Sequence, residues 1–124
     1  MQDEPTPTEL IKAVADFLRN DIAPAISGHN AFKLRVSINA LDLVTRQLAL
    51  EQGSDAAEAA RLVQLLGTQG SLGELNRALA GRIATGEVDL QTPGLAEHLW
   101  QTTMAKLAVD QPNYASYKRE LDEK

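Results

Sequence analysis

The sequence predicts an all-α protein, a compact bundle of about five helices followed by a short C-terminal tail helix. Three observations favour this class. Alanine and leucine supply most of the apolar content, whereas aromatic residues make up only 4% of the chain, and such a composition suits helices better than strands. Apolar residues recur at helical spacing in segments bounded by capping residues, glycine or proline. No alternating run flanked by hairpin residues predicts a strand.

The first helix is predicted to begin at Thr6-Pro7-Thr8-Glu9. Thr6 can act as the N-cap, Pro7 suits the first helical position and Glu9 can close a capping box. The helix should end or kink before Pro24, because a proline disfavours helical geometry at the preceding residue. Its apolar stripe consists of Leu10, Val14, Phe17, Leu18 and Ile22.

The second helix is predicted from about Asn30 to Leu50. At roughly 100° per residue, its apolar residues cover about two-thirds of the circumference. An arc that wide is typical of a helix packed on several sides. We therefore expect this helix to be central, with the others assembled around it.

Start and stop signals divide the rest of the chain. A third helix is expected from Ser54-Asp55 to Gly67, after a break at Gly53. The fourth should start at the capping box Ser71 to Glu74 and end at Gly86, and the fifth should run from Thr92-Pro93 to Pro112. Residues 113–124 form the tail and residues 1–6 are expected to be flexible, so that residues 1–124 make a single domain.

Charge and composition exclude several classes of partner. The net charge is −5 and no basic block occurs, which argues against nucleic acid and against an anionic membrane surface. The absence of cysteine excludes disulfides and zinc–thiolate sites. No apolar run approaches membrane-spanning length, and the acidic N-terminus does not resemble a secretory signal. These features predict a cytoplasmic protein without a membrane anchor.

No catalytic, cofactor or metal constellation is present in the sequence. His29 and His98 fit no metal-ligand spacing. Gly67, Gly70 and Gly73 precede a helix, but neither a preceding strand nor a Gly-Lys-Ser/Thr ending accompanies them, so they are explained as cap and turn glycines. We therefore expect a non-enzymatic chain that carries no cofactor.

The most informative polar feature lies on the second helix, where four residues fall within an arc of roughly 60°. One interpretation is a solvated stripe with an i,i+4 ion pair, and a second is a buried structural network. A third is a ligand site, because two guanidiniums and an amide can hold a carboxylate or phosphate. The residues are Arg35, Asn39, Asp42 and Arg46.

Asp21, in the first helix, is a further candidate member of the polar network that the second helix is predicted to form. On a helical wheel it falls on the apolar side of the first helix. A carboxylate in such a place needs a donor or access to water, because an unpaired buried charge is very costly. We therefore expect an ion pair between Asp21 and Arg35 that ties the first two helices together.

Aromatic residues near the C-terminus suggest packing rather than chemistry. Trp100 and Met104 are four residues apart and share a helix face, which is typical of a core or an interface. Tyr114 and Tyr117 lie in the tail, where we expect them to pack back on the same chain or on a second copy.

Three patches resemble an uncharacterised bacterial family of all-helical domains. They run from Phe32 through Leu41 to Arg46, from Leu75 through Ile83 to Gly86, and from Lys106 to Pro112. Members of that family are often encoded beside, or fused to, phosphotransferase-like kinases and acyl-CoA dehydrogenases. The resemblance implies an accessory domain with such a partner, and it assigns no residue a catalytic role.

Two functions follow from these observations. The first is a non-enzymatic accessory or protein-interaction domain that supports a partner enzyme and forms a homo-oligomer. The alternative is a small-ligand or acyl-CoA-related binding domain that uses Arg35, Asn39 and Arg46. A deep pocket at those residues would favour the ligand, whereas a flat apolar patch of several hundred Å² would favour protein association.

Overall fold

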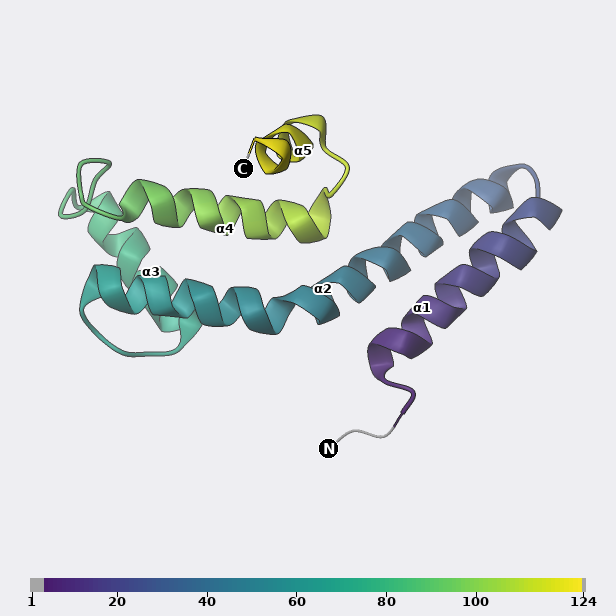
Figure 1. The fold of residues 1–124 in the computed structure, drawn as a ribbon, viewed down its shortest axis with the longest axis horizontal. Helices are drawn as coiled ribbons and strands as arrows, with labels where there is room; N and C mark the ends of the chain where they lie inside the picture. Colours follow the sequence, from purple (N-terminus) through teal and green to yellow (C-terminus); the bar gives the residue numbers. More distant parts are fainter. Residues whose placement is uncertain (1–3, 124) are drawn as a thin grey trace. The chain divides into compact units, whose positions relative to one another are not determined.

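The computed structural model describes residues 4–123, and within this range it contains helices and no strand, as predicted (Figure 1). Its contacts divide the chain into two compact units, residues 1–50 and residues 51–124. One long helix contributes its first part to the first unit and its second part to the other. The α-helices are α1 (Pro7–Phe17), α2 (His29–Leu66), α3 (Leu72–Ala84), α4 (Leu95–Asp110) and α5 (Ala115–Asp122).

The first unit is an antiparallel hairpin of α1 and the first part of α2 (Figure 1). The start of α1 is as predicted, because the Thr6 hydroxyl accepts a hydrogen bond from the backbone N–H of Glu9 at 3.2 Å. After Phe17 the chain continues as a π-helical turn over Leu18–Ile22 and a 3-10 turn over Ala23–Ala25. The α-helix thus ends before Pro24, as predicted, although π-helical and 3-10 turns continue the chain to Ala25. Residues 7–50 are called the hairpin below.

The predicted break at Gly53 is wrong, because α2 runs without interruption for 38 residues through that position. A glycine inside a helix costs only about 1 kcal/mol relative to alanine. Strong helix formers lie on both sides, among them Glu51 and Ala56, and no proline follows. The two helices expected from 30 to 50 and from 54 to 66 are thus one.

The expectation that residues 30–50 are packed on several sides is not met. Of their large apolar side chains only Ile38 is buried, while Phe32 and Val36 remain more than half exposed. Within residues 4–50 a single neighbouring helix, α1, lies along this segment (Figure 1), and one neighbour covers one side only. A wide apolar arc therefore remains in contact with solvent.

The second unit holds a leucine-rich core. It is built from the end of α2, from α3 and from the segment that leads into α4. Gly67 ends α2 with a φ of 69°, a left-handed conformation that suits glycine. The buried core residues are Leu62, Leu66, Leu75, Leu79, Val88 and Leu95.

The start of α4 differs from the prediction at Thr92-Pro93. The Thr92 hydroxyl accepts a hydrogen bond from the Asp89 backbone N–H at 3.0 Å, so Thr92 stabilises the preceding loop. The helix begins at Leu95, and its N-cap is Gly94 with a φ of 91°. A threonine side chain can either cap a helix or bond to the backbone of a local turn. Thr92 forms the turn, so it does not cap α4.

The capping box of α3 is confirmed. The Ser71 hydroxyl accepts from the Glu74 N–H at 3.1 Å, and the Glu74 carboxylate accepts from the Ser71 N–H at 3.0 Å. The hydrogen bond from the Ser71 backbone N–H, followed by the Ser71 hydroxyl, lowers the pKa of the Glu74 carboxyl group. The box satisfies two N–H groups that a helix start otherwise leaves without a partner.

We expect Ser71→Ala to lower the free energy of unfolding by about 1 kcal/mol, because it removes the N-cap acceptor. Ser37→Ala is the matched control. Its hydroxyl bonds only to the Lys33 carbonyl of the same helix, and alanine is the better helix former. Urea denaturation of both variants measures the difference. Equal stabilities would contradict a stabilising role for the box.

The two ends of the chain agree with the sequence in part. The tail forms the helix α5, as predicted. Of the segment expected to be flexible, residues 1–3 lie outside the described range, and Thr6 is fixed as the N-cap of α1.

Candidate functional site

Four charged side chains form a network along one edge of the hairpin, which we call the polar edge (Lys12, Asp16, Arg19 and Asp42). Arg19 lies at its centre. Its guanidinium donates to the Asp42 carboxylate of α2 at 2.6 Å and to the Asp16 carboxylate of α1 at 3.0 Å. Lys12 approaches Asp16 at 2.8 Å. The Arg19–Asp42 pair therefore links the π-helical turn that follows α1 to α2.

The network shifts the protonation equilibria of its members. The hydrogen bond from Lys12 is the largest cause of the lowered pKa of Asp16. The hydrogen bond to Asp42, followed by the Asp42 charge, raises the pKa of Arg19. Both effects favour the charged forms. All four side chains are at least one-third exposed, so each pair contributes little to stability.

The four residues of the polar stripe predicted on the second helix have different environments in the structure. Asp42 belongs to the polar edge, whereas the Arg35 guanidinium lies over the Phe32 ring, 6.0 Å from its centroid. Asn39 is exposed and Arg46 is half-buried. The Asp42–Arg46 pair and a ligand role for the stripe stay predictions.

The predicted ion pair between Asp21 and Arg35 is not formed, since no ion pair within residues 4–123 includes Asp21. Asp21 lies in the π-helical turn and is exposed. The prediction assumed that the stripe of Leu10, Val14 and Phe17 is buried, but these residues are about half exposed. Asp21 is therefore hydrated. Arg19 makes the link between α1 and α2 instead.

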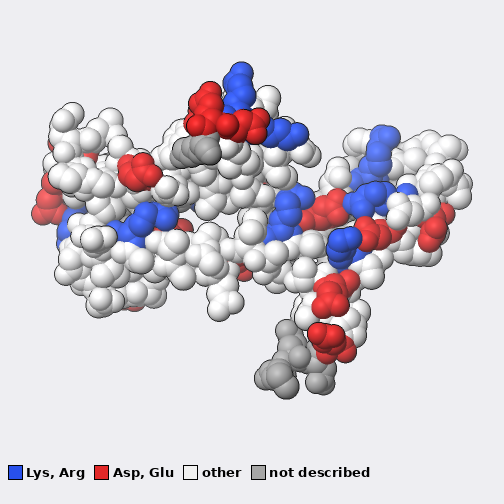
Figure 2. All heavy atoms as spheres, viewed as in Figure 1, with Lys and Arg blue, Asp and Glu red and all other residues white. Residues whose placement is uncertain are grey.

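Five exposed apolar side chains form what we call the apolar face of the hairpin (Leu10, Val14, Phe17, Val44 and Leu48). Their exposed fractions lie between 40% and 52%. Because Arg19 reaches Asp42 in this antiparallel pair, Phe17 and Val44 lie within about one helical turn of each other along the hairpin. A helical wheel at about 100° per residue places all five on the side of the seam opposite the polar edge. Acidic and basic side chains intermingle elsewhere on the hairpin (Figure 2).

The second unit contains a groove of about 430 Å³ that we call the Arg61–His98 groove. His98 is buried, with 2% of its surface exposed. Its Nδ1 accepts a hydrogen bond from Arg61 Nε at 3.0 Å, and Arg61 Nη2 donates to the Thr102 hydroxyl at 3.2 Å. Burial, followed by the Arg61 charge, lowers the pKa of His98. The other lining residues are Gln64, Leu65, Pro93, Gly94 and Glu97.

Sequence reasoning missed this groove. A usable signal was the spacing of Leu95, His98 and Thr102, which places all three on one face of the predicted fifth helix. Leu95 and His98 are both buried there. The arginine partner lies 37 residues earlier, and no local pattern identifies it.

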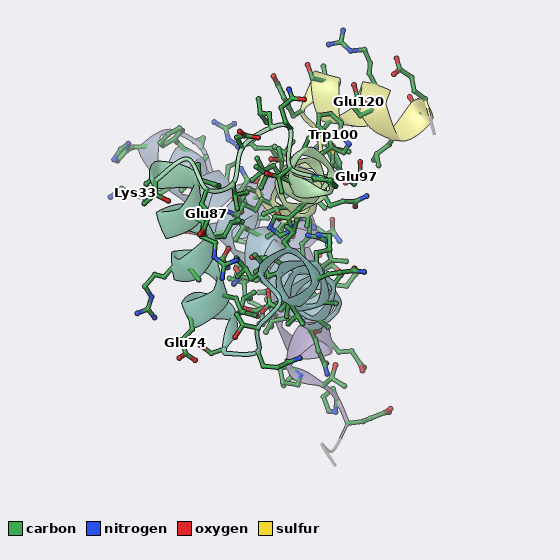
Figure 3. All side chains as sticks on the ribbon, turned by 90° about the vertical axis from the view of Figure 1, so that its left-hand side faces the viewer. Lys33, Glu74, Glu87, Glu97, Trp100 and Glu120 are labelled. Carbon is green, nitrogen blue, oxygen red and sulfur yellow. The ribbon has the colours of Figure 1, made fainter. Side chains whose placement is uncertain are left out.

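A smaller hollow of about 170 Å³ lies where α5 packs against α4. Trp100 and Met104 of α4 line it together with Tyr114, Tyr117 and Glu120. Trp100 and Glu120 project from these two helices in Figure 3. Tyr117 is half-buried. The expectation that the tail aromatics pack back on the same chain is met for this residue.

Neither a metal-binding cluster nor a membrane-spanning helix is found among residues 4–123. In residues 4–123 no group of three or more histidine or acidic side chains is placed to hold a metal ion. No helix of that range combines the length and the apolar character needed to cross a membrane.

Residues 24–114 match the model of a family described as a domain of unknown function, DUF6285. The matched range contains all three patches on which the resemblance to an uncharacterised helical family rested. Searches of curated proteins and of solved structures found no significant match.

Proposed function

We propose that this chain, which belongs to the DUF6285 family, is a non-enzymatic association domain that accompanies a partner enzyme. We further propose that it pairs with a second copy of itself through the apolar face. The exposure of Leu10, Val14 and Phe17, each at least half exposed at helical spacing, is the observation that carries this proposal. Apolar faces of this kind mark interaction surfaces.

The size of the apolar face suits a weak to moderate dimer. Its five side chains, which are 40–52% exposed, leave on the order of a few hundred Å² of apolar surface uncovered, the size at which exposed patches are often functional. Two such faces with their polar rims would bury about 1,000 Å² or more, which is close to the lower limit for specific interfaces. We therefore expect a dissociation constant of about 1–100 µM.

The pattern of charge favours a second copy as the occupant. The five residues of the apolar face carry no charge, and the ion pairs of Arg19 lie on the opposite edge. Asp21, which is exposed, borders this face about one turn beyond Phe17. A two-fold interface must be complementary to itself, and an uncharged apolar face meets that condition. Two hairpins joined in this way form a four-helix bundle, in which the half-exposed residues become core.

The accessory role rests on the family resemblance found in the sequence, which implies a phosphotransferase-like kinase or an acyl-CoA dehydrogenase as the partner enzyme. Co-purification of the full chain with such an enzyme from the same genome tests this part. The alternative, an acyl-CoA-related ligand on the stripe of Arg35, Asn39 and Arg46, has less support. Asp42 lies among these residues, and its carboxylate opposes an anion.

The double variant Val14→Asp/Phe17→Asp tests the dimer. Both residues are half exposed in the single chain, so their replacement should leave the helices intact. Four carboxylates brought into the interface of the dimer would repel one another in a desolvated place. We expect self-association at least about tenfold weaker than in the wild type. Sedimentation velocity over about 5–500 µM measures it.

Leu90→Asp is the matched control, because Leu90 is 72% exposed in the loop before α4. It adds the same kind of charge away from the hairpin and should leave self-association unchanged. Circular dichroism checks the helix content of all three proteins. A wild-type chain that stays monomeric over this range, or a double variant that associates as tightly, would contradict the proposal.

A further inference from the structure

A second binding site follows from the Arg61–His98 groove and is independent of the association proposed above. We infer that this groove binds the carboxylate of a small ligand and that the apolar part of the ligand lies against Leu65 and Pro93. The inference rests on hydrogen-bond donors that have no partner, on the size of the groove and on the start of α4.

The protonation state of His98 follows from its partner. A guanidinium only donates hydrogen bonds, so Nδ1, which accepts from Arg61 Nε, carries no proton. The neutral ring must then carry its proton on Nε2. This nitrogen has no hydrogen-bond partner within residues 4–123. No buried side-chain nitrogen or oxygen of the described residues lacks a partner, so Nε2 must be accessible from the groove that His98 lines. There it can donate to a ligand that supplies an acceptor.

Two further sources of donors border the groove. Arg61 uses Nε and Nη2 within the protein, and its Nη1 has no partner among the described residues. The first turn of α4 follows Gly94, which offers no side chain to cap it. The N–H groups of Ala96 and Glu97 thus lack an intrahelical acceptor. Gly94 and Glu97 of this turn line the groove, and the helix dipole favours an anion there.

The groove also limits the size and shape of the ligand. About 430 Å³ is in the range of small-molecule sites, and most of its exposed lining is apolar. Glu97 is the one acidic residue in the lining. It is exposed and accepts a hydrogen bond from Gln101 at 2.7 Å. The buried part therefore offers donors and apolar carbon, which suits a carboxylate with an aliphatic chain.

Nuclear magnetic resonance on the ¹⁵N-labelled full chain tests this site, with hexanoate as the probe. Acetate supplies the head group alone and hexan-1-ol the chain alone. We expect saturable shifts at the Ala96 and Glu97 amides and at His98 Nε2, with a dissociation constant of about 1–10 mM. Acetate and hexan-1-ol should bind at least about tenfold more weakly.

Arg61→Met should weaken hexanoate binding at least about tenfold, since it removes a charged donor. Arg77→Met is the matched control, because it removes the same charge from the exposed surface of α3. His98→Phe keeps Arg61 and removes the Nε2 donor together with the Nδ1 acceptor of Arg61 Nε. Weaker hexanoate binding by this variant therefore tests the site even where Arg61→Met unfolds. Equal affinity for hexan-1-ol, shifts confined to the hollow at Tyr117, or equal weakening by Arg77→Met would overturn the inference.

Discussion

Replacing Leu62 with alanine should lower the free energy of unfolding by about 3–4 kcal/mol, because it leaves a cavity in the most buried part of the second unit. Leu62 has no exposed surface and lies among Leu66, Leu75 and Leu79. Neighbours from two helices surround the site, so they can close the cavity only in part. The loss is a large fraction of the stability of a domain of this size.

Guanidinium denaturation followed by tryptophan fluorescence measures this effect on the second unit, because the single tryptophan of the chain, Trp100, lies in α4. Leu90→Ala is the control. Leu90 is 72% exposed, and its truncation should change the stability by less than about 0.5 kcal/mol. If the two truncations proved equally harmless, Leu62 would not belong to a tightly packed core.

The sequence was sufficient to predict the fold class and most helix ends, because these depend on local chemistry. Thr6 and Ser71 are N-caps in the structure, and Gly67 ends α2. Predictions failed where two local signals compete. Gly53 alone does not break a helix that has strong helix formers on both sides, and Thr92 serves a turn instead of a cap.

Sequence periodicity predicted which residues share a helix face, but not which face is covered. Leu10, Val14 and Phe17 do form one stripe, yet the stripe is half exposed. The burial of a helix face depends on contacts between elements that are distant in sequence. Such contacts determine which side of α1 faces α2. The assumed burial of the stripe led to the incorrect Asp21–Arg35 pair. The actual pair joins Arg19 and Asp42.

The candidate sites show the same limit. The apolar face depends on how α1 packs against α2, and the Arg19–Asp42 pair that spans the two helical segments joins residues 23 positions apart in sequence. The Arg61–His98 groove combines residues 37 positions apart. A single sequence without an alignment offers no signal for such pairs. The groove nevertheless lies in the range matched by the family model.

We expect His98 to make the stability of the protein depend on pH near neutrality. Burial and the Arg61 charge lower its pKa in the folded state below the ordinary value of 6.5, while Glu58 acts in the opposite direction. Where a folded chain resists a proton that the unfolded chain accepts, stability falls as the pH falls. This contribution is fully present above about pH 6.5. It is lost progressively as the pH falls from there toward the lower pKa of the folded state.

The free energy of unfolding of the wild type should therefore decrease between about pH 7 and pH 5, by at most about 1.4 kcal/mol per pH unit for this one group. In His98→Gln the decrease should be clearly smaller, because the variant has no imidazole to protonate. His29→Gln removes the exposed histidine at the start of α2 and should keep the wild-type slope. Urea denaturation at several pH values measures all three. If wild type and His98→Gln had parallel profiles, the buried ring would not be a neutral acceptor for Arg61.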